Sequence, residues 1–97
     1  MDMEHLYIVT YDVRDPRRWK RLFRAMHGFG DWLQLSVFQC RLDKVRRLRL
    51  EAAIQGIVNA REDHVLIIDL GPADAVALRV SSIGKAFDPV RRESVIV

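Results

Sequence analysis

Residues Leu6–Val13, LYIVTYDV, decide the fold of this chain, and the Asp15-Pro16 pair that follows them sets the start of the first helix. The segment is rich in β-branched and aromatic residues and is apolar at odd and even positions alike, which predicts a central strand of a sheet. Asp15 is suited to cap a helix, and Pro16 is suited to be its first residue. We therefore expect a strand that ends near Asp12 and turns directly into a helix.

The first helix combines one apolar stripe with a strongly basic remainder. Its apolar residues recur at helical spacing and predict a face that packs on the core: Trp19, Leu22, Phe23 and Met26. Basic residues occupy most of the other positions: Arg17, Arg18, Lys20, Arg21 and Arg24. The helix is therefore expected to carry a dense positive charge on its solvent side.

Further elements follow along the chain. Trp32–Cys40, WLQLSVFQC, predicts a second strand, in which Trp32, Gln34, Ser36, Phe38 and Cys40 share one face. Asp43 predicts the cap of a second helix over residues 44–59. His64–Leu70, HVLIIDL, predicts a third strand that is again apolar on both faces.

The last quarter of the chain predicts three short elements. Asp74–Val80 has the pattern of a short helical turn, and Ile83–Phe87 and Ser94–Val97 resemble short strands. The chain as a whole predicts an α+β fold, a ferredoxin-like βαββαβ sandwich with an extra C-terminal strand, in a single domain over residues 1–97. We expect the first and third predicted strands to be central, because both are nearly continuous apolar runs.

The second predicted strand also indicates an oligomer. Trp32, Phe38 and Cys40 share a face with polar Gln34 and Ser36, and an exposed mixed patch of this kind favours a homodimer. Cys40 itself is interpreted as a small buried hydrophobic residue.

Composition excludes several classes of protein. The chain has 97 residues, of which 49% are hydrophobic and 30% charged, as expected of one globular domain. The longest apolar run is four residues, so we expect no membrane protein. No signal-like segment precedes the first strand, which predicts a cytoplasmic location. One Cys and three scattered His residues give no zinc spacing.

Charge is unevenly distributed along the chain. Residues 1–50 hold eleven Lys and Arg against six Asp and Glu, whereas residues 51–97 hold five against seven. Thirteen of the sixteen basic residues are Arg, whose planar guanidinium suits contacts with phosphate. Nucleic acid is therefore the expected partner, and a merely solvated arginine-rich helix is the alternative interpretation.

Asp12 is the sharpest candidate for chemistry. It is a carboxylate at the end of a strand, followed by Arg14 and the basic helix. One interpretation is a residue that caps the turn together with Asp15, and the other is a ligand of Mg²⁺. Mg²⁺ commonly takes one or two protein carboxylates and keeps its waters, so one Asp per subunit would suffice at a two-fold axis. Asp69, at the end of the third predicted strand, is a second candidate near such a metal.

These segments together resemble the CRISPR-associated "Cas two" family. The resemblance is carried by YIVTYDV, DPRRW, GDWLQLSVFQCRL, DHVLIIDLGPAD and IGKAFDPVRRESVIV, and it covers essentially the whole chain. It implies a ferredoxin-like homodimer whose C-terminal strand crosses to the partner's sheet. It also implies a metal-dependent endonuclease that acts on single-stranded RNA or double-stranded DNA, for which we expect Mg²⁺ as the ion, with Mn²⁺ as the alternative.

The resemblance assigns roles to individual residues. Asp12 is implied to be the metal-binding and catalytic carboxylate. The residues implied or expected to bind nucleic acid are Arg14, Arg17, Arg18, Arg21 and Arg24. Those implied to support the site or an interface are Tyr11, Ser36 and Phe38. Trp32 stands where family members often have Arg.

Two functions follow from the resemblance. The first is a Mg²⁺-dependent endonuclease that takes part in spacer acquisition as a dimeric bridge between two dimers of the CRISPR integrase. The alternative is a non-catalytic adaptor that binds double-stranded DNA in the same assembly. A toxin-type ribonuclease or a ligand-sensing regulator is a more distant interpretation.

Overall fold

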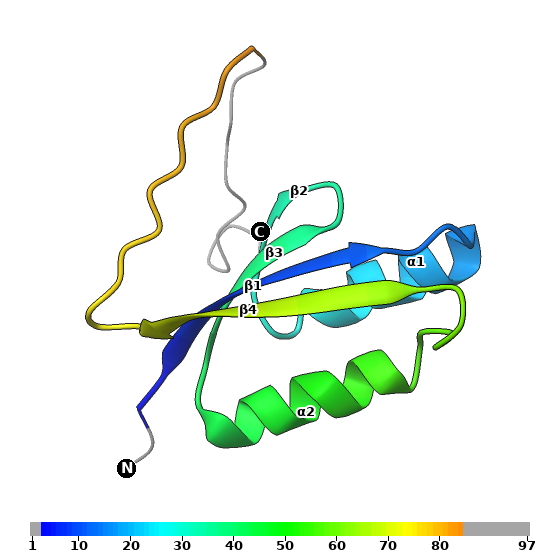
Figure 1. Ribbon diagram of the computed structural model, residues 1–97, viewed down its shortest axis with the longest axis horizontal. Helices are drawn as coiled ribbons and strands as arrows, with labels where there is room; N and C mark the ends of the chain where they lie inside the picture. The colour runs from blue at the N-terminus through cyan, green and yellow to red at the C-terminus, as the bar shows by residue number, and fades with distance from the viewer. Residues whose placement is uncertain (1–2, 85–97) are drawn as a thin grey trace, which may run out of the picture.

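A computed structural model describes residues 3–84 of the chain (Figure 1). Its elements, in chain order, are β1 (His5–Asp12), α1 (Pro16–Met26), β2 (Asp31–Gln34), β3 (Val37–Leu42), α2 (Lys44–Gln55) and β4 (His64–Pro72). The strands form one antiparallel sheet in the order β2-β3-β1-β4. This βαββαβ connection with β3 and β1 in the centre is the ferredoxin-like arrangement that the sequence predicts.

The predicted second strand is wrong in one respect, because it is a hairpin of two strands. β2 and β3 pair with each other, and the chain reverses at Leu35 and Ser36. Leu35 has a φ of 37°, so a branched residue takes the left-handed backbone that tight hairpin turns require. Leu35 is also 73% exposed, consistent with a turn tip. The usual Gly or Asn signal is missing from WLQLSVFQC, and the turn was therefore invisible in the sequence.

The predicted central position of the third strand is also wrong, because β4 lies at an edge of the sheet that residues 3–84 form. Its apolar residues alternate between the two faces. Val65 and Ile67 pack against the core, whereas Leu66, Ile68 and Leu70 are 47%, 43% and 38% exposed. We call the sheet face that carries these three residues the open face. An edge strand with apolar residues on both faces has the same sequence pattern as a central strand.

Both helices begin at the aspartates that the sequence indicates. The Asp15 carboxylate accepts hydrogen bonds from the backbone N–H groups of Arg17 and Arg18, at 2.8 and 3.1 Å. The Asp43 carboxylate accepts one from the backbone N–H of Arg46, at 2.8 Å. These caps satisfy amides that a helix start leaves unpaired. α2 is shorter than predicted and ends at Gln55.

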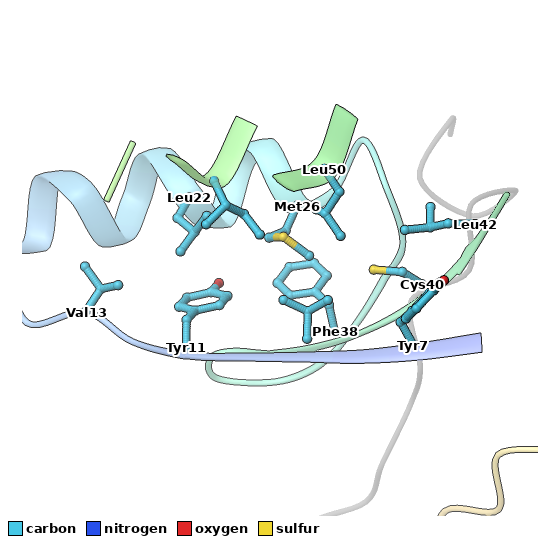
Figure 2. Close-up of a cluster of buried hydrophobic side chains, with 11 residues drawn as sticks. Tyr7, Tyr11, Val13, Leu22, Met26, Phe38, Cys40, Leu42 and Leu50 are labelled. Atoms are coloured by element: carbon cyan, nitrogen blue, oxygen red, sulfur yellow. The ribbon is translucent and has the colours of Figure 1, made fainter. Parts of the chain in front are cut away.

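The core lies between the sheet and the two helices, as Figure 2 shows. Strand residues Tyr7, Tyr11, Phe38 and Cys40, and Val13 just after β1, point toward side chains that α1 and α2 contribute. The helices supply Leu22, Met26, Leu50 and Ile54. Phe38 and Cys40 are fully buried, so the dimer patch expected on the second strand is wrong. Leu66, Ile68 and Leu70 leave apolar surface uncovered on the opposite face, along β4.

The remaining expectations concern the end of the chain. Ala73–Ala75 form a turn, and no helix is present over residues 74–80. The predicted strand Ile83–Phe87 lies largely outside the described residues, and Ser94–Val97 lies wholly outside them. Among residues 3–84, neither helix has the length and apolar character needed to cross a membrane.

Candidate functional site

Asp12 is the last residue of β1, and its side chain is exposed. In the antiparallel ladder Asp12 lies opposite His64, the first residue of β4. Residues directly opposite each other in a ladder share a face of the sheet, and Ile8 lies opposite Ile68, a residue of the open face. Asp12 is four residues from Ile8 on the same strand, so its side chain is on the same face as that of Ile8. Asp12 and His64 therefore belong to the open face, at one end of it. Within residues 3–84 the Asp12 carboxylate makes no hydrogen bond or ion pair, so it remains available to a ligand.

Ser36 ties three elements together beside Asp12. Its carbonyl oxygen accepts the backbone N–H of Tyr11 at 3.1 Å, and its Oγ accepts the indole N–H of Trp19 at 2.8 Å. The β2–β3 turn, the end of β1 and the start of α1 are thus held at one place. Ser36 therefore positions the backbone on which Asp12 stands, and its hydroxyl is already engaged by Trp19.

Tyr11 and Phe38 lie in the core and not beside the Asp12 carboxylate. Tyr11 is 5% exposed and Phe38 is fully buried, and their rings stack at 6.4 Å between centroids. The Tyr11 hydroxyl has no hydrogen-bond partner in the described structure (Figure 2). Burial raises the pKa of Tyr11 to about 12. Both side chains pack in the core, so Phe38 presents no surface to a partner in the single chain, and a supporting role for the two residues stays a prediction.

The basic residues of α1 point in different directions, because successive helix positions are turned by about 100°. Arg17, Arg21 and Arg24 are exposed, as is Arg14 in the loop after Asp12. Their guanidinium groups make no ion pair with other residues of the range 3–84. Four of the five predicted nucleic-acid-binding arginines therefore remain free to contact phosphate.

Arg18 differs from the other arginines of α1, because carboxylates surround it. Its guanidinium donates to Asp63 at 2.7 Å and to Glu62 at 2.8 Å, and it lies 3.4 Å from Asp15. The Asp63 side chain is wholly covered, and its Oδ2 also accepts the backbone N–H of Asn59. These hydrogen bonds lower the pKa of Asp63 and raise that of Arg18. Arg18 thus fastens α1 to the loop before β4 and is a poor candidate for phosphate binding.

Asp69 lies at the other end of β4 from Asp12, so the expectation that it shares Asp12's end of the sheet is wrong. It is paired with Tyr7 in the ladder and bonded to His5, with 2.9 Å between the His5 Nδ1 and a carboxylate oxygen. It also accepts the backbone N–H of Gly71 at 2.8 Å. These hydrogen bonds lower the pKa of Asp69. Because β4 runs antiparallel to β1, the end of β4 that carries Asp69 lies beside the start of β1 and away from Asp12.

Residues 3–84 of a single copy of the chain enclose no metal site. Over the described residues, no three His, Cys, Asp or Glu side chains lie together as a metal site. Asp12 supplies one exposed carboxylate, and His64 supplies an imidazole beside it. The Asp12 carboxylate is the kind of oxygen ligand that Mg²⁺ takes while keeping most of its waters, whereas the His64 imidazole is not a ligand that such a hard cation prefers.

Sequence reasoning missed two residues near the site. His64 precedes an apolar run and carries no motif, so only the register of β1 with β4 reveals it as Asp12's neighbour. The sequence places Lys20 among the basic residues of the first helix, and the structure adds that it lies beside Trp19 and Phe23 along a groove. The helical spacing of these three residues was the available signal.

The chain as a whole is similar to several known proteins. A family model described as "CRISPR associated protein Cas2" matches residues 3–76. The chain is 70% identical over 95 residues to a Geobacter sulfurreducens protein named CRISPR-associated endoribonuclease Cas2, covering 98% of this chain and 100% of that one. It is 49% identical to a Rhodospirillum rubrum protein named CRISPR-associated endoribonuclease Cas2 1, over 97% and 92% of the two chains. The fold superimposes on the crystal structure of a hypothetical protein from Thermus thermophilus, with a TM-score of 0.74 and 26% identity, over 88% and 99% of the chains.

Proposed function

This chain belongs to the Cas2 family of CRISPR-associated proteins, and on that premise we propose that it is an endoribonuclease with Asp12 as its catalytic carboxylate. The observation that carries the proposal is the free, exposed carboxylate of Asp12 at the end of β1, with Arg14 two residues further on. A carboxylate without a protein partner is available to a cation or to water, and an adjacent guanidinium attracts a phosphodiester. The proposed substrate is single-stranded RNA, with double-stranded DNA as the alternative.

Mg²⁺ is the proposed cofactor, and Mn²⁺ is the alternative ion. When bound, the ion lowers the pKa of a coordinated water and stabilises charge on the phosphate. Asp12 is the residue that would hold it, because its carboxylate is exposed and unpaired within residues 3–84. A hard cation held by few protein ligands needs a second carboxylate for tight binding. Over residues 3–84 no group of three His, Cys, Asp or Glu side chains encloses a metal, and Asp12 of a second copy of the chain would supply the further carboxylate.

The proposed active form is therefore a homodimer joined through the open face. Leu66, Ile68 and Leu70 present apolar surface there, and Asp12 stands at the end of the same face. Apolar patches of this kind are costly to leave in water and mark association sites. A two-fold axis across the open face would bring the two Asp12 carboxylates toward each other.

Substrate binding is proposed to come from the free arginines near Asp12. Arg14 and Arg17 lie closest to it along the chain, and Arg21 and Arg24 continue along α1. Contacts of this type go to phosphates, so they bind many sequences alike. Arg18 is excluded from the set because Asp63 and Glu62 already occupy its guanidinium.

A second proposed role uses the same arginines without Asp12. α1 lies on the helix side of the sheet, whereas Asp12 belongs to the open face. A dimer can therefore bind double-stranded DNA along α1 as an adaptor between two dimers of the CRISPR integrase. This partner is a prediction from the family resemblance, and so is the bridging geometry.

Asp12→Asn is the test of the proposed nuclease, because it removes the charge and keeps the shape of the side chain. Cleavage of labelled single-stranded RNA is measured for both proteins with Mg²⁺, with Mn²⁺ and with chelator. We expect the variant to lose about 100-fold or more in rate, since metal assistance is worth several kcal/mol and each 1.4 kcal/mol is tenfold. Cleavage by the variant at the wild-type rate would overturn the assignment. Unchanged DNA binding by the variant would leave the adaptor role standing alone.

A further inference from the structure

A groove of about 540 Å³ lies between the β1–α1 loop and one side of α1. Val13, Trp19 and Phe23 form its apolar floor. Arg14, Lys20 and Arg24 stand around it as a cationic rim. The volume falls within the roughly 300–1,000 Å³ that small-molecule sites occupy. We call this feature the α1 groove.

The floor of the α1 groove is aromatic and held in place. The rings of Trp19 and Phe23 stack with 5.0 Å between centroids and 11° between planes. The indole N–H of Trp19 is fixed by the Ser36 hydroxyl at 2.8 Å, and Phe23 packs edge-on against the buried Phe38. Both aromatic rings are only partly buried, so some of their surface faces the groove.

The rim of the α1 groove carries uncompensated positive charge. Arg14, Lys20 and Arg24 are exposed, and none of them forms an ion pair with another residue between 3 and 84. Lys20 and Arg24 are four residues apart on α1, so they lie on the same side of the helix. Arg18, on another side of α1, shows the contrast, because carboxylates neutralise it. Three free cations around an apolar floor are complementary to a ligand with a flat ring and attached phosphates.

From this complementarity we infer that the α1 groove binds one unpaired nucleotide of a single-stranded RNA. The base rests against the Trp19–Phe23 floor, and the flanking phosphates contact Arg14, Lys20 and Arg24. Aromatic platforms beside positive charge bind single strands in this way, and stacking is worth about 1–3 kcal/mol per base. A base inside a duplex has its faces covered by its neighbours, so a duplex does not enter the α1 groove. The choice of RNA over DNA rests on the proposed ribonuclease function.

The position of the α1 groove gives it a role in placing the substrate. Val13 and Arg14 directly follow Asp12, and two residues of backbone span at most about 7 Å. The Asp12 side chain belongs to the open face, on the other side of the sheet from α1, so a strand held in the α1 groove would reach that carboxylate only by passing around the end of β1. The groove would therefore select unpaired RNA and hold it at the end of β1 where Asp12 stands.

The test uses Trp19 as a fluorescent reporter. The chain contains two tryptophans, so Trp32→Phe leaves Trp19 as the only one, and Asp12→Asn in the same protein prevents cleavage during titration. Three probes are titrated: a short single-stranded RNA, the same RNA with one central abasic site, and the same sequence as an RNA duplex. We expect saturable quenching by the single strand, weaker quenching by the abasic strand at equal occupancy, and none by the duplex. Equal quenching by intact and abasic strands, or binding without quenching, would overturn the inference.

Matched rim variants separate base docking from general attraction to phosphate. Lys20→Ala with Arg24→Ala should lower affinity for single-stranded RNA by about tenfold more than affinity for the duplex, because only the single strand enters the groove. Arg17→Ala with Arg21→Ala should lower both affinities alike. Arg49→Ala, an exposed arginine on α2 away from the groove, is the control and should change neither. An equal loss for both probes in the Lys20 and Arg24 variant would reduce the rim to a general phosphate contact and contradict the proposal.

Single-stranded DNA of the same sequence tests the choice of RNA. Weaker quenching by DNA supports RNA as the ligand, and equal quenching at equal concentration overturns that choice. Because all titrations use the Asp12→Asn background, their outcome does not depend on catalysis. Failure of the ribonuclease proposal would appear only in the cleavage assay, and failure of the groove proposal only in these binding measurements.

Discussion

Asp12 and His64 face each other as the last residue pair of the β1–β4 ladder, and both side chains are exposed. A carboxylate placed at position 64 would therefore stand beside the proposed metal ligand. We expect His64→Asp to lower the Mg²⁺ concentration for half-maximal RNA cleavage by roughly tenfold, because affinity for a hard cation rises with the number of charged ligands. Cleavage rates over a Mg²⁺ titration measure this shift.

Arg61→Asp is the control for His64→Asp, since residue 61 is exposed in the α2–β4 loop and is not part of the β1–β4 ladder. It adds negative charge near the same end of the sheet without placing it opposite Asp12. An equal shift of the Mg²⁺ requirement in both variants would show a long-range charge effect and contradict a ligand position at residue 64.

The exposed arginines of α1 predict a salt-dependent affinity for nucleic acid. Arg17→Ala with Arg21→Ala should weaken binding alike for all sequences and reduce the slope of log affinity against log salt by about 2 for a duplex, near 0.9 per lost phosphate contact. Binding isotherms at several salt concentrations measure the slope. An unchanged slope would place the contact surface elsewhere on the molecule.

The open face predicts where association occurs. Ile68→Glu places a charge in the middle of that face, where Ile68 is 43% exposed in the single chain. We expect the dimer dissociation constant to rise by about 100-fold or more, because an unpaired charge would have to be buried. Sedimentation equilibrium measures it. Leu48→Glu on α2, where Leu48 is 61% exposed, is the matched control and should leave the assembly intact.

The sequence predicts those parts of the fold that depend on neighbouring residues. Asp15 before Pro16 predicts the start of α1, because a capping side chain bonds to backbone groups within the first turn of its own helix. The turn at Leu35 escapes prediction, because its backbone is imposed by the pairing of β2 with β3 and not by a turn residue. The edge position of β4 cannot be predicted either, since an apolar edge strand and a central strand have the same pattern of apolar residues. The engagement of Arg18 depends on Asp63, a contact between residues distant in the chain.

Asp63 predicts a loss of stability in acid. Its pKa is lowered in the folded protein, chiefly by the hydrogen bond from Arg18, so ionised Asp63 favours the folded state. That contribution is complete above the unfolded pKa, near 4, and is lost as the pH falls toward the lowered folded value. We expect Asp63→Asn to melt several degrees lower than wild type at neutral pH. The difference in melting temperature between Asp63→Asn and wild type should become smaller at about pH 3. A difference that does not change with pH would contradict this account.

Tyr11 predicts a substitution that increases stability. Its hydroxyl is buried without a hydrogen-bond partner within residues 3–84, and such a group costs about 1–3 kcal/mol of desolvation. Tyr11→Phe removes the hydroxyl and keeps the ring stacked on Phe38. We expect the free energy of unfolding to rise by about 1 kcal/mol, measured by urea titration. A decrease would show that the hydroxyl has a partner in solution.

The open face also has a consequence for how the protein responds to its own abundance. If two copies of Asp12 complete one centre, the fraction of competent molecules obeys mass action. Below the dissociation constant, total cleavage rises with the square of the protein concentration, and above it only in proportion. In a cell that holds few copies, most molecules would be monomers and therefore inactive. A modest increase in synthesis would then raise the total cleavage rate more than in proportion. The apolar residues of the open face would in this way make the activity of the enzyme depend on how many copies of it the cell contains.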